Sequence, residues 1–245
     1  MNDNRVILHE QFNALKRYSF NFDRNVIFKN GLYVLFEKGE KFLEFDRIVR
    51  VGTHTGQNNL VKRLTEHFLK PNKDRSIFRK HIGRAILSRD NNLELLKQWE
   101  IDLTGKKARE EWAGKIDTAA IKSVEDRVTA YMQEYFTFSV IPLETKEERL
   151  FFEAGIIATT SRSPHFYPSA NWLGKFSPEE KIRTRGVWLV HGLNGRSLTE
   201  AEMGDLIKCA ETSRLKELNS KDITVFKQHE RSSENASRDN FFNKT

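Results

Sequence analysis

The segment 58–70 predicts a short amphipathic helix that places two polar side chains at the edge of its apolar stripe. At about 100° per residue, Arg63 and His67 lie one turn apart where this stripe meets solvent. Clefts form at such boundaries, so the cation and the neighbouring imidazole could face a ligand. The alternative is structural, with an arginine that extends along the core beside a partly buried histidine.

Glu153 is a second candidate, because it interrupts the apolar face of a predicted helix. In the segment 147–160, Phe152, Ile156 and Ile157 define an apolar arc, and Glu153 falls inside it. Burying a carboxylate there costs several kcal/mol unless a cation or hydrogen-bond donors meet it. The sequence therefore predicts such partners next to Glu153, either in a functional site or in a structural ion pair.

The positive charge of the chain is concentrated around the first of these helices. The net charge of the 245 residues is +7, and residues 46–84 alone hold ten basic and three acidic residues. The excess in this region equals that of the whole chain, so the remainder is close to neutral. Such a region favours a polyanionic partner.

The composition also narrows the class of protein. A single cysteine, Cys209, excludes an internal disulfide and a cysteine-based zinc site. No stretch approaches about 18 consecutive apolar residues, and the N-terminal segment lacks a signal-peptide pattern. We therefore expect a cytoplasmic protein without membrane contact.

The elements that must position these residues follow an α+β order. Residues 30–52 predict two strands around a turn at Glu37–Glu40, and residues 136–143 predict a third strand. The segregation of strands and helices predicts a small antiparallel sheet of about three strands flanked by helices, not a doubly wound sheet. Helices are expected at 58–70, 76–89 and 147–160, and from Ser123, Ser177 and Thr199 onward.

Five short elements follow one another along these expected strands and helices. They are GLY at 31–33, RVG at 50–52, Arg63, Glu153 on a later helix, and Asn171 after a proline-containing loop. In this order they resemble the motifs of the GIY-YIG nuclease superfamily. The spacing from Arg63 to His67 is similar to that of the family's restriction-endonuclease branch. One residue departs from the pattern, because Arg50 stands where the second motif has a tyrosine.

The resemblance covers residues 30–175 and divides the chain into four expected regions. An N-terminal extension, 1–29, precedes the nuclease core, which contains a helical insertion at 90–121. A helical extension, 176–219, follows the core, and a polar, disordered tail is expected at 220–245.

The family resemblance implies metal-assisted hydrolysis of a phosphodiester bond, with Mg²⁺ or Mn²⁺ as the cofactor. Glu153 would bind the metal, and Arg63 would hold the scissile phosphate. Tyr33 would orient or deprotonate the attacking water, and His67 would hydrogen-bond to Tyr33 or to the phosphate. Asn171 would position the phosphate or the ligands of the metal. The function implied is a DNA endonuclease of restriction type.

Double-stranded DNA is the implied partner. Contacts to its backbone are expected from Arg50, Arg79, Lys80 and Arg84. A homodimer and a cognate methyltransferase are further partners that a restriction enzyme would allow. A repair or mobile-element nuclease of the same fold stays open, as does a DNA-binding protein that lost activity because Arg50 replaces a tyrosine.

Overall fold

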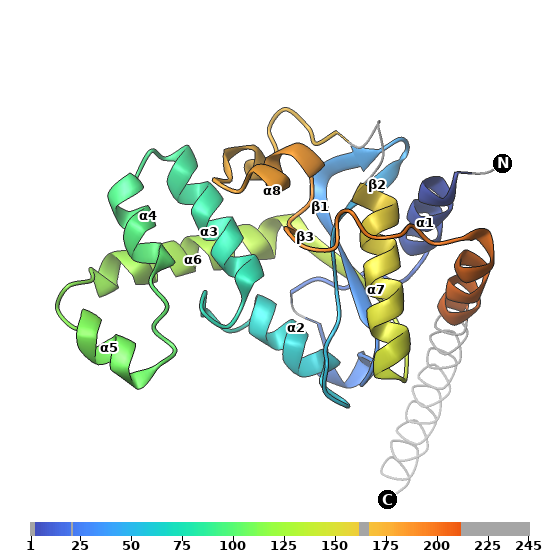
Figure 1. The fold of residues 1–245 in the computed structure, drawn as a ribbon, viewed down its shortest axis with the longest axis horizontal. Coiled ribbons are helices and arrows are strands. Elements are labelled where there is room, and N and C mark those ends of the chain that lie inside the picture. Colours follow the sequence, from blue (N-terminus) through green and yellow to red (C-terminus); the bar gives the residue numbers. More distant parts are fainter. Residues whose placement is uncertain (1–2, 21, 162–166, 212–245) are drawn as a thin grey trace, which may run out of the picture.

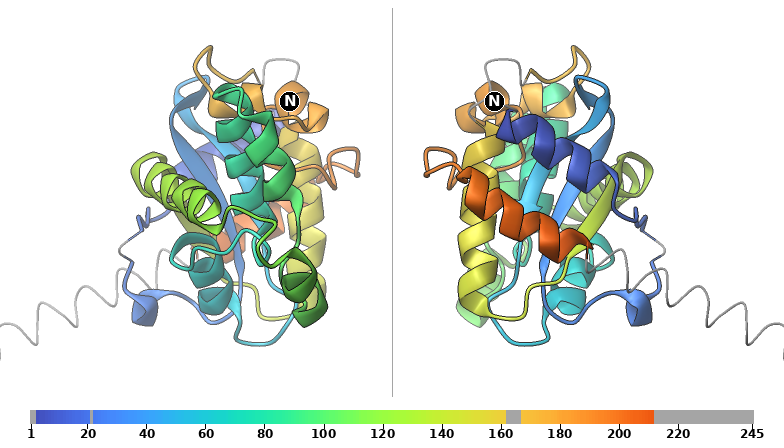
Figure 2. Two further views of the ribbon diagram at one scale, coloured as in Figure 1. Left: turned by 90° about the vertical axis from the view of Figure 1, so that its left-hand side faces the viewer. Right: turned by 90° about the vertical axis from the view of Figure 1, so that its right-hand side faces the viewer.

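Three antiparallel strands form a sheet that is covered by helices on both faces (Figures 1 and 2). The computed structural model describes residues 3–20, 22–161 and 167–211. The expected α+β fold with a small antiparallel sheet is confirmed. The strands are β1 (Leu32–Phe42), β2 (Phe45–Gly52) and β3 (Phe136–Ile141), in the order β2-β1-β3.

The helices pack in two layers against separate hydrophobic clusters. Helices α2, α3, α4, α6 and α8 share one cluster, whereas α1, α7 and a C-terminal helix at 200–211 share the cluster on the other face. Short 3-10 turns lie at η1 (Arg24–Val26) and η2 (Leu173–Phe176). Besides the C-terminal helix, the α-helices of the described residues are α1 (Asn4–Asn13), α2 (Leu60–Phe68), α3 (Ile77–Arg89), α4 (Leu93–Glu100), α5 (Lys106–Trp112), α6 (Thr118–Tyr135), α7 (Lys146–Ser161) and α8 (Glu180–Arg185).

The turn of the β1–β2 hairpin lies later in the chain than expected. β1 runs through Glu37 and Glu40, and the chain reverses at 43–44. Both glutamates are buried, and Glu37 accepts hydrogen bonds from the Tyr131 hydroxyl and, at 2.7 Å, from the Trp172 indole N–H. Buried polar groups with such partners are compatible with a strand, so the polarity of this stretch did not mark the turn.

Three later helix starts are expected from capping patterns. The start at Ser177 is wrong, because α8 begins at Glu180 with Glu179 at its N-cap. α6 begins after Asp117, whose carboxylate caps it, and not at Ser123 as expected. The last helix begins as expected, because Thr199 and Glu202 form a capping box with N–H to side-chain oxygen distances of 2.8 and 3.3 Å. The tail expected at 220–245 lies outside the described residues.

The cations of α3 are engaged by carboxylates. Arg79 is fully buried, and its guanidinium donates two hydrogen bonds to the Glu125 carboxylate, at 2.8 and 3.0 Å. Lys80 and Arg84 pair with Glu100 at 3.5 and 2.6 Å. The contact to DNA expected from Arg79 is wrong, because Arg79 has no exposed surface. Lys80 and Arg84 would have to exchange their ion pairs with Glu100 for a phosphate.

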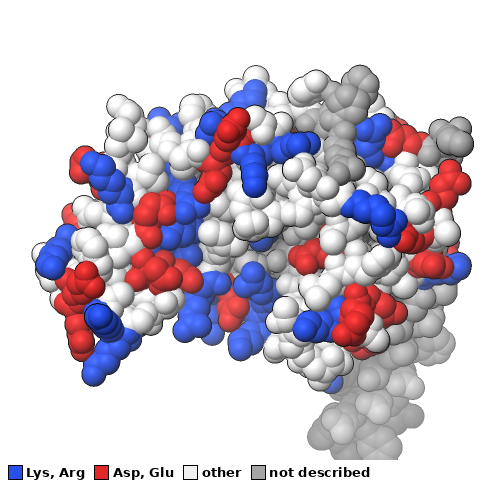
Figure 3. Space-filling model, viewed as in Figure 1, with Lys and Arg blue, Asp and Glu red and all other residues white. Residues whose placement is uncertain are grey.

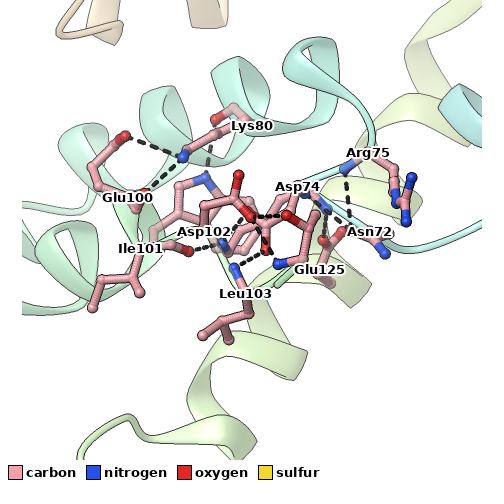
Figure 4. A network of polar contacts seen from close by, with 12 residues as sticks. Asn72, Asp74, Arg75, Lys80, Glu100, Ile101, Asp102, Leu103 and Glu125 are labelled. Atoms are coloured by element: carbon pink, nitrogen blue, oxygen red, sulfur yellow. Dashed lines mark hydrogen bonds and ion pairs between the residues drawn. The ribbon is translucent and has the colours of Figure 1, made fainter. Parts of the chain in front are cut away.

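A network of polar contacts fixes the loop between α2 and α3 (Figure 4). Glu125 of α6 accepts a hydrogen bond from the backbone N–H of Lys73 in this loop. Asp74 accepts one from the N–H of Leu103 at 3.1 Å, and the Asn72 side chain accepts one from the N–H of Asp74 at 3.0 Å. The loop is thereby joined to α6 and to the segment after α4, which fixes the C-terminal end of α2.

Replacing Arg79 by Met should lower the free energy of unfolding by about 3–5 kcal/mol, because Glu125 would be left buried without its cation. The control Lys80→Met removes an ion pair with a largely exposed partner and should cost about 1 kcal/mol or less. Urea denaturation of both variants measures the difference. Equal, small losses would show that the buried pair does not hold the loop.

Candidate active site

A polar pocket of about 340 Å³ opens between α2, the loop after β2, and α7. It brings together Arg63, expected at the edge of its apolar stripe, and Glu153, expected inside the apolar arc of its helix. We call it the α2–α7 pocket. Its lining consists of Thr53, His54, Thr55, Gly56, Asn59, Lys62, Arg63, Glu66, Leu150 and Glu153.

Glu153 is half-buried in the wall of this pocket. Burial raises the pKa of its carboxyl, while Arg50, the backbone N–H of Thr53 and Arg63 act in the opposite direction. Among the influences that oppose burial, Arg50 is the largest. The partners that the sequence predicted for a buried carboxylate are therefore present, and they leave Glu153 facing a polar pocket.

Tyr33 is buried next to the pocket and is not one of the residues that line it. Glycine occupies the position opposite Tyr33 in the hairpin. Tyr33 pairs with Gly52 across β1 and β2, and a Cβ atom on Gly52 would lie 2.4 Å from the phenolic oxygen. Any larger residue at 52 would displace the ring. The glycine of the RVG motif is thus needed to place the Tyr33 hydroxyl.

Arg50 lies beneath the pocket and not on the DNA-facing surface expected for it. It is 6% exposed, donates a hydrogen bond to the carbonyl of Trp188, and lies over the Phe78 ring at 4.9 Å. Burial lowers the pKa of its guanidinium, and the neighbouring Tyr33 acts against this shift. Arg50 therefore supplies buried positive charge next to Tyr33 and Glu153.

His67 is fully buried behind Tyr33. Its Nδ1 lies 2.6 Å from the Ser76 hydroxyl, and the two rings of His67 and Tyr33 are 6.0 Å apart. Burial, reinforced by Arg63, Arg50 and Arg79, lowers the pKa of His67 well below 6.5. The imidazole is therefore neutral at neutral pH, and its position favours a role beside Tyr33 over direct contact with a phosphate.

Asn171 is not part of this pocket. It lines a different pocket, together with Lys38. Lys38 lies five residues beyond Tyr33 on β1, which is about 17 Å along the strand. The segment is held there because the backbone N–H and hydroxyl of Ser169 donate to the Glu40 carboxylate, at 3.0 and 2.5 Å. The role expected for Asn171 at the phosphate or metal is therefore corrected.

Arg149 was not singled out from the sequence, although it also lies within the apolar arc of α7. It is fully buried one turn before Glu153, and its guanidinium donates to the carbonyls of His54 at 3.3 Å, Leu143 at 3.2 Å and Glu144 at 2.7 Å. An arginine at such a position is a detectable signal of buried acceptors. Arg149 ties the helix that carries Glu153 to the loop that lines the pocket.

His54 extends this connection to the first motif. The Gly31 N–H donates to His54 Nε2 at 3.3 Å, so Nδ1 carries the proton and donates to the Gly56 carbonyl at 2.6 Å. Burial, with a smaller contribution from Arg149, lowers the pKa of His54, which favours this neutral form. Arg149 and His54 together join the start of β1, the pocket loop and α7.

Replacing Arg149 by Met should loosen the pocket loop, because its bonds to backbone carbonyls are lost. We expect faster amide hydrogen exchange in residues 53–59 than in the wild-type protein. The control is Arg47→Met, since Arg47 is also fully buried but binds Glu40 and the Gly186 carbonyl. Unchanged exchange at 53–59 in Arg149→Met, or equal acceleration in both variants, would contradict a specific connection.

The comparisons with known proteins identify the family. The sequence profile of the GIY-YIG domain matches residues 8–213, which includes the resemblance seen over 30–175 and extends it on both sides. No curated protein and no solved structure matches the chain significantly. Within the described part of the chain, no helix is long and apolar enough to cross a membrane. The chain belongs to the GIY-YIG domain family, which makes it a nuclease.

Proposed function

We propose that this nuclease is a Mg²⁺-dependent DNA endonuclease of restriction type, and that the α2–α7 pocket holds the scissile phosphodiester. The observation that supports this most strongly is the convergence of Arg63 and Glu153 on one polar pocket. The buried Tyr33 packs against Gly52, the residue before Thr53 of the pocket lining. A cation, a carboxylate and a phenol are the groups needed to bind a phosphate, hold a metal and orient a water.

The residues of the pocket fit a hard divalent cation. Among the described residues, no group of three or more His, Cys, Asp or Glu side chains could hold a metal. Mg²⁺ keeps several waters and takes only one or two carboxylates from a protein, so Glu153 alone is a sufficient anchor, for Mn²⁺ as well. When bound, such an ion would polarise the phosphate and offset its charge.

The remaining groups act on the phosphate and the water. Arg63 is 30% exposed in its side chain and only loosely paired with Glu66, at 3.8 Å, so its guanidinium is available to the phosphate oxygens. Its charge would offset the negative charge that grows in the transition state. The Tyr33 hydroxyl would orient the attacking water, with Arg50 fixing the phenol and His67 packing behind it.

Cations of α2 and the following loop are the proposed contacts to the DNA backbone. Lys62, Lys70 and Arg75 are exposed, and none of them forms an ion pair with another described residue. Lysine and arginine side chains gather on the surface over α2 (Figure 3). These residues replace the cations of α3 in the proposal, because charges that are not already paired contribute most to phosphate binding.

Cleavage separates this proposal from its alternatives. A DNA-binding protein of this fold that lost activity through Arg50 would bind duplex DNA without cutting it. A repair or mobile-element nuclease would cut plasmid DNA without the discrete fragment ladder of a restriction enzyme. A homodimer and a cognate methyltransferase belong to the restriction-type proposal and are tested by solution mass and by protection of methylated DNA.

Replacing Glu153 by Gln keeps the shape of the side chain but removes its charge. If Glu153 anchors the metal, Mg²⁺-dependent plasmid cleavage should fall by orders of magnitude, while duplex binding persists or tightens. Before the metal binds, burial raises the pKa of this carboxyl, so the Mg²⁺ concentration needed for cleavage by the wild-type protein should rise on acidification. A folded Glu153→Gln protein that cuts at the wild-type rate would refute the metal role.

A further inference from the structure

The helix α8 carries positive charge that no carboxylate of the described residues neutralises. Lys181, Arg183 and Arg185 lie on this helix, and none of them forms an ion pair in the described part of the chain. Lys181 donates to the carbonyl of Val190 at 3.3 Å, and Arg185 donates to that of Ser161 at 3.4 Å. These bonds order the side chains without cancelling their charge, in contrast to the paired cations of α3.

A second polar pocket, of about 480 Å³, lies beside these cations. Arg185 is held at its wall by a hydrogen bond to the Asn194 amide oxygen at 3.1 Å. Glu180 is the one carboxylate in the lining, against the two cations Lys181 and Arg185, so the balance is positive. The lining consists of Glu180, Lys181, Thr184, Arg185, Val190, His191, Gly192, Leu193, Asn194 and Gly195.

This second pocket borders the helix that carries Glu153. A Cβ atom on Gly192 would lie 3.3 Å from the Ile157 side chain, and Ile157 is one turn beyond Glu153 on α7. Arg185 contacts Ser161, eight residues beyond Glu153, or about 12 Å along the helix. The segment after α8 crosses in front of β2 and reaches the top of α7 in Figure 1.

We propose that the α8 surface, formed by Lys181, Thr184, Arg185 and His191, binds a backbone phosphate of the duplex whose scissile phosphate occupies the α2–α7 pocket. This inference rests on the proposed function. The N–H groups of Lys181 and Arg185 would donate charge-assisted hydrogen bonds to the phosphate oxygens. The length of α7 from Glu153 to Ser161, about 12 Å, matches three or four steps along the duplex axis, so a contact at each end would fix the register of the cut.

The test measures duplex binding by fluorescence anisotropy between 50 and 200 mM salt, in EDTA so that cleavage is absent. Lys181→Gln should make the slope of log K against log salt less steep by about 0.9, so its defect is about 3.5-fold larger at 50 mM than at 200 mM. Thr184→Glu, which removes no cation, should weaken binding, and Glu180→Gln should tighten it. The matched control Lys208→Gln removes the same charge from an exposed pair with Asp205 outside both pockets and should leave the slope unchanged.

The outcomes separate this inference from the proposed function. If the wild-type protein cleaves DNA but Lys181→Gln and Lys208→Gln both keep its slope of log K against log salt, the phosphate site on the α8 surface alone is overturned. Binding that depends on Lys181 and Glu180 in a protein that never cleaves would support the α8 site and overturn the endonuclease. A folded wild-type protein without affinity for duplex DNA at 50 mM salt would overturn both.

Discussion

The half-buried carboxylate of Glu153 is the constraint on which the organisation of the site depends. A carboxylate in that position must be met by donors or cations, since its desolvation is costly. Arg50 and Thr53, on β2 and directly after it, and Arg63 on α2 act against the desolvation of this carboxyl. This requirement brings β2 and α2 together around α7, and the polar pocket is the space that remains between them.

The scaffold around the pocket is itself held by buried polar groups. Glu37 accepts the indole N–H groups of Trp172 and Trp188, which attach the C-terminal segment to β1. Glu125 fixes the loop after α2, and Arg149 fixes the loop after β2. Each contact joins residues far apart in sequence, so each acts as a positioning contact for the elements that carry Tyr33, Arg63 and Glu153. The same contacts explain why a chain with net charge +7 leaves only part of its positive charge at the surface.

Local periodicity was sufficient to predict much of the fold and the two central residues of the site. The helix with Arg63, the helix with Glu153 and the strands around them follow from patterns that burial imposes on neighbouring residues. Periodicity cannot report which distant group satisfies a buried polar side chain. The sequence therefore predicted a turn at Glu37 and a surface cation at Arg79, although each residue is buried with a partner from α6. The position of Asn171 could not be predicted for the same reason, because its loop is tied to the distant end of β1.

Single-turnover cleavage by Arg63 variants tests the central claim, that the α2–α7 pocket binds and stabilises the scissile phosphate, most directly. In Arg63→Ala the rate should fall by about 10²- to 10³-fold, since one charge contact in a transition state is commonly worth about 3–4 kcal/mol. Arg63→Lys should recover little of this loss, because lysine lacks the planar fork of arginine. Duplex binding and thermal stability should stay close to the wild-type values in both variants. Folded Arg63→Ala protein that cleaves at the wild-type rate would contradict the account.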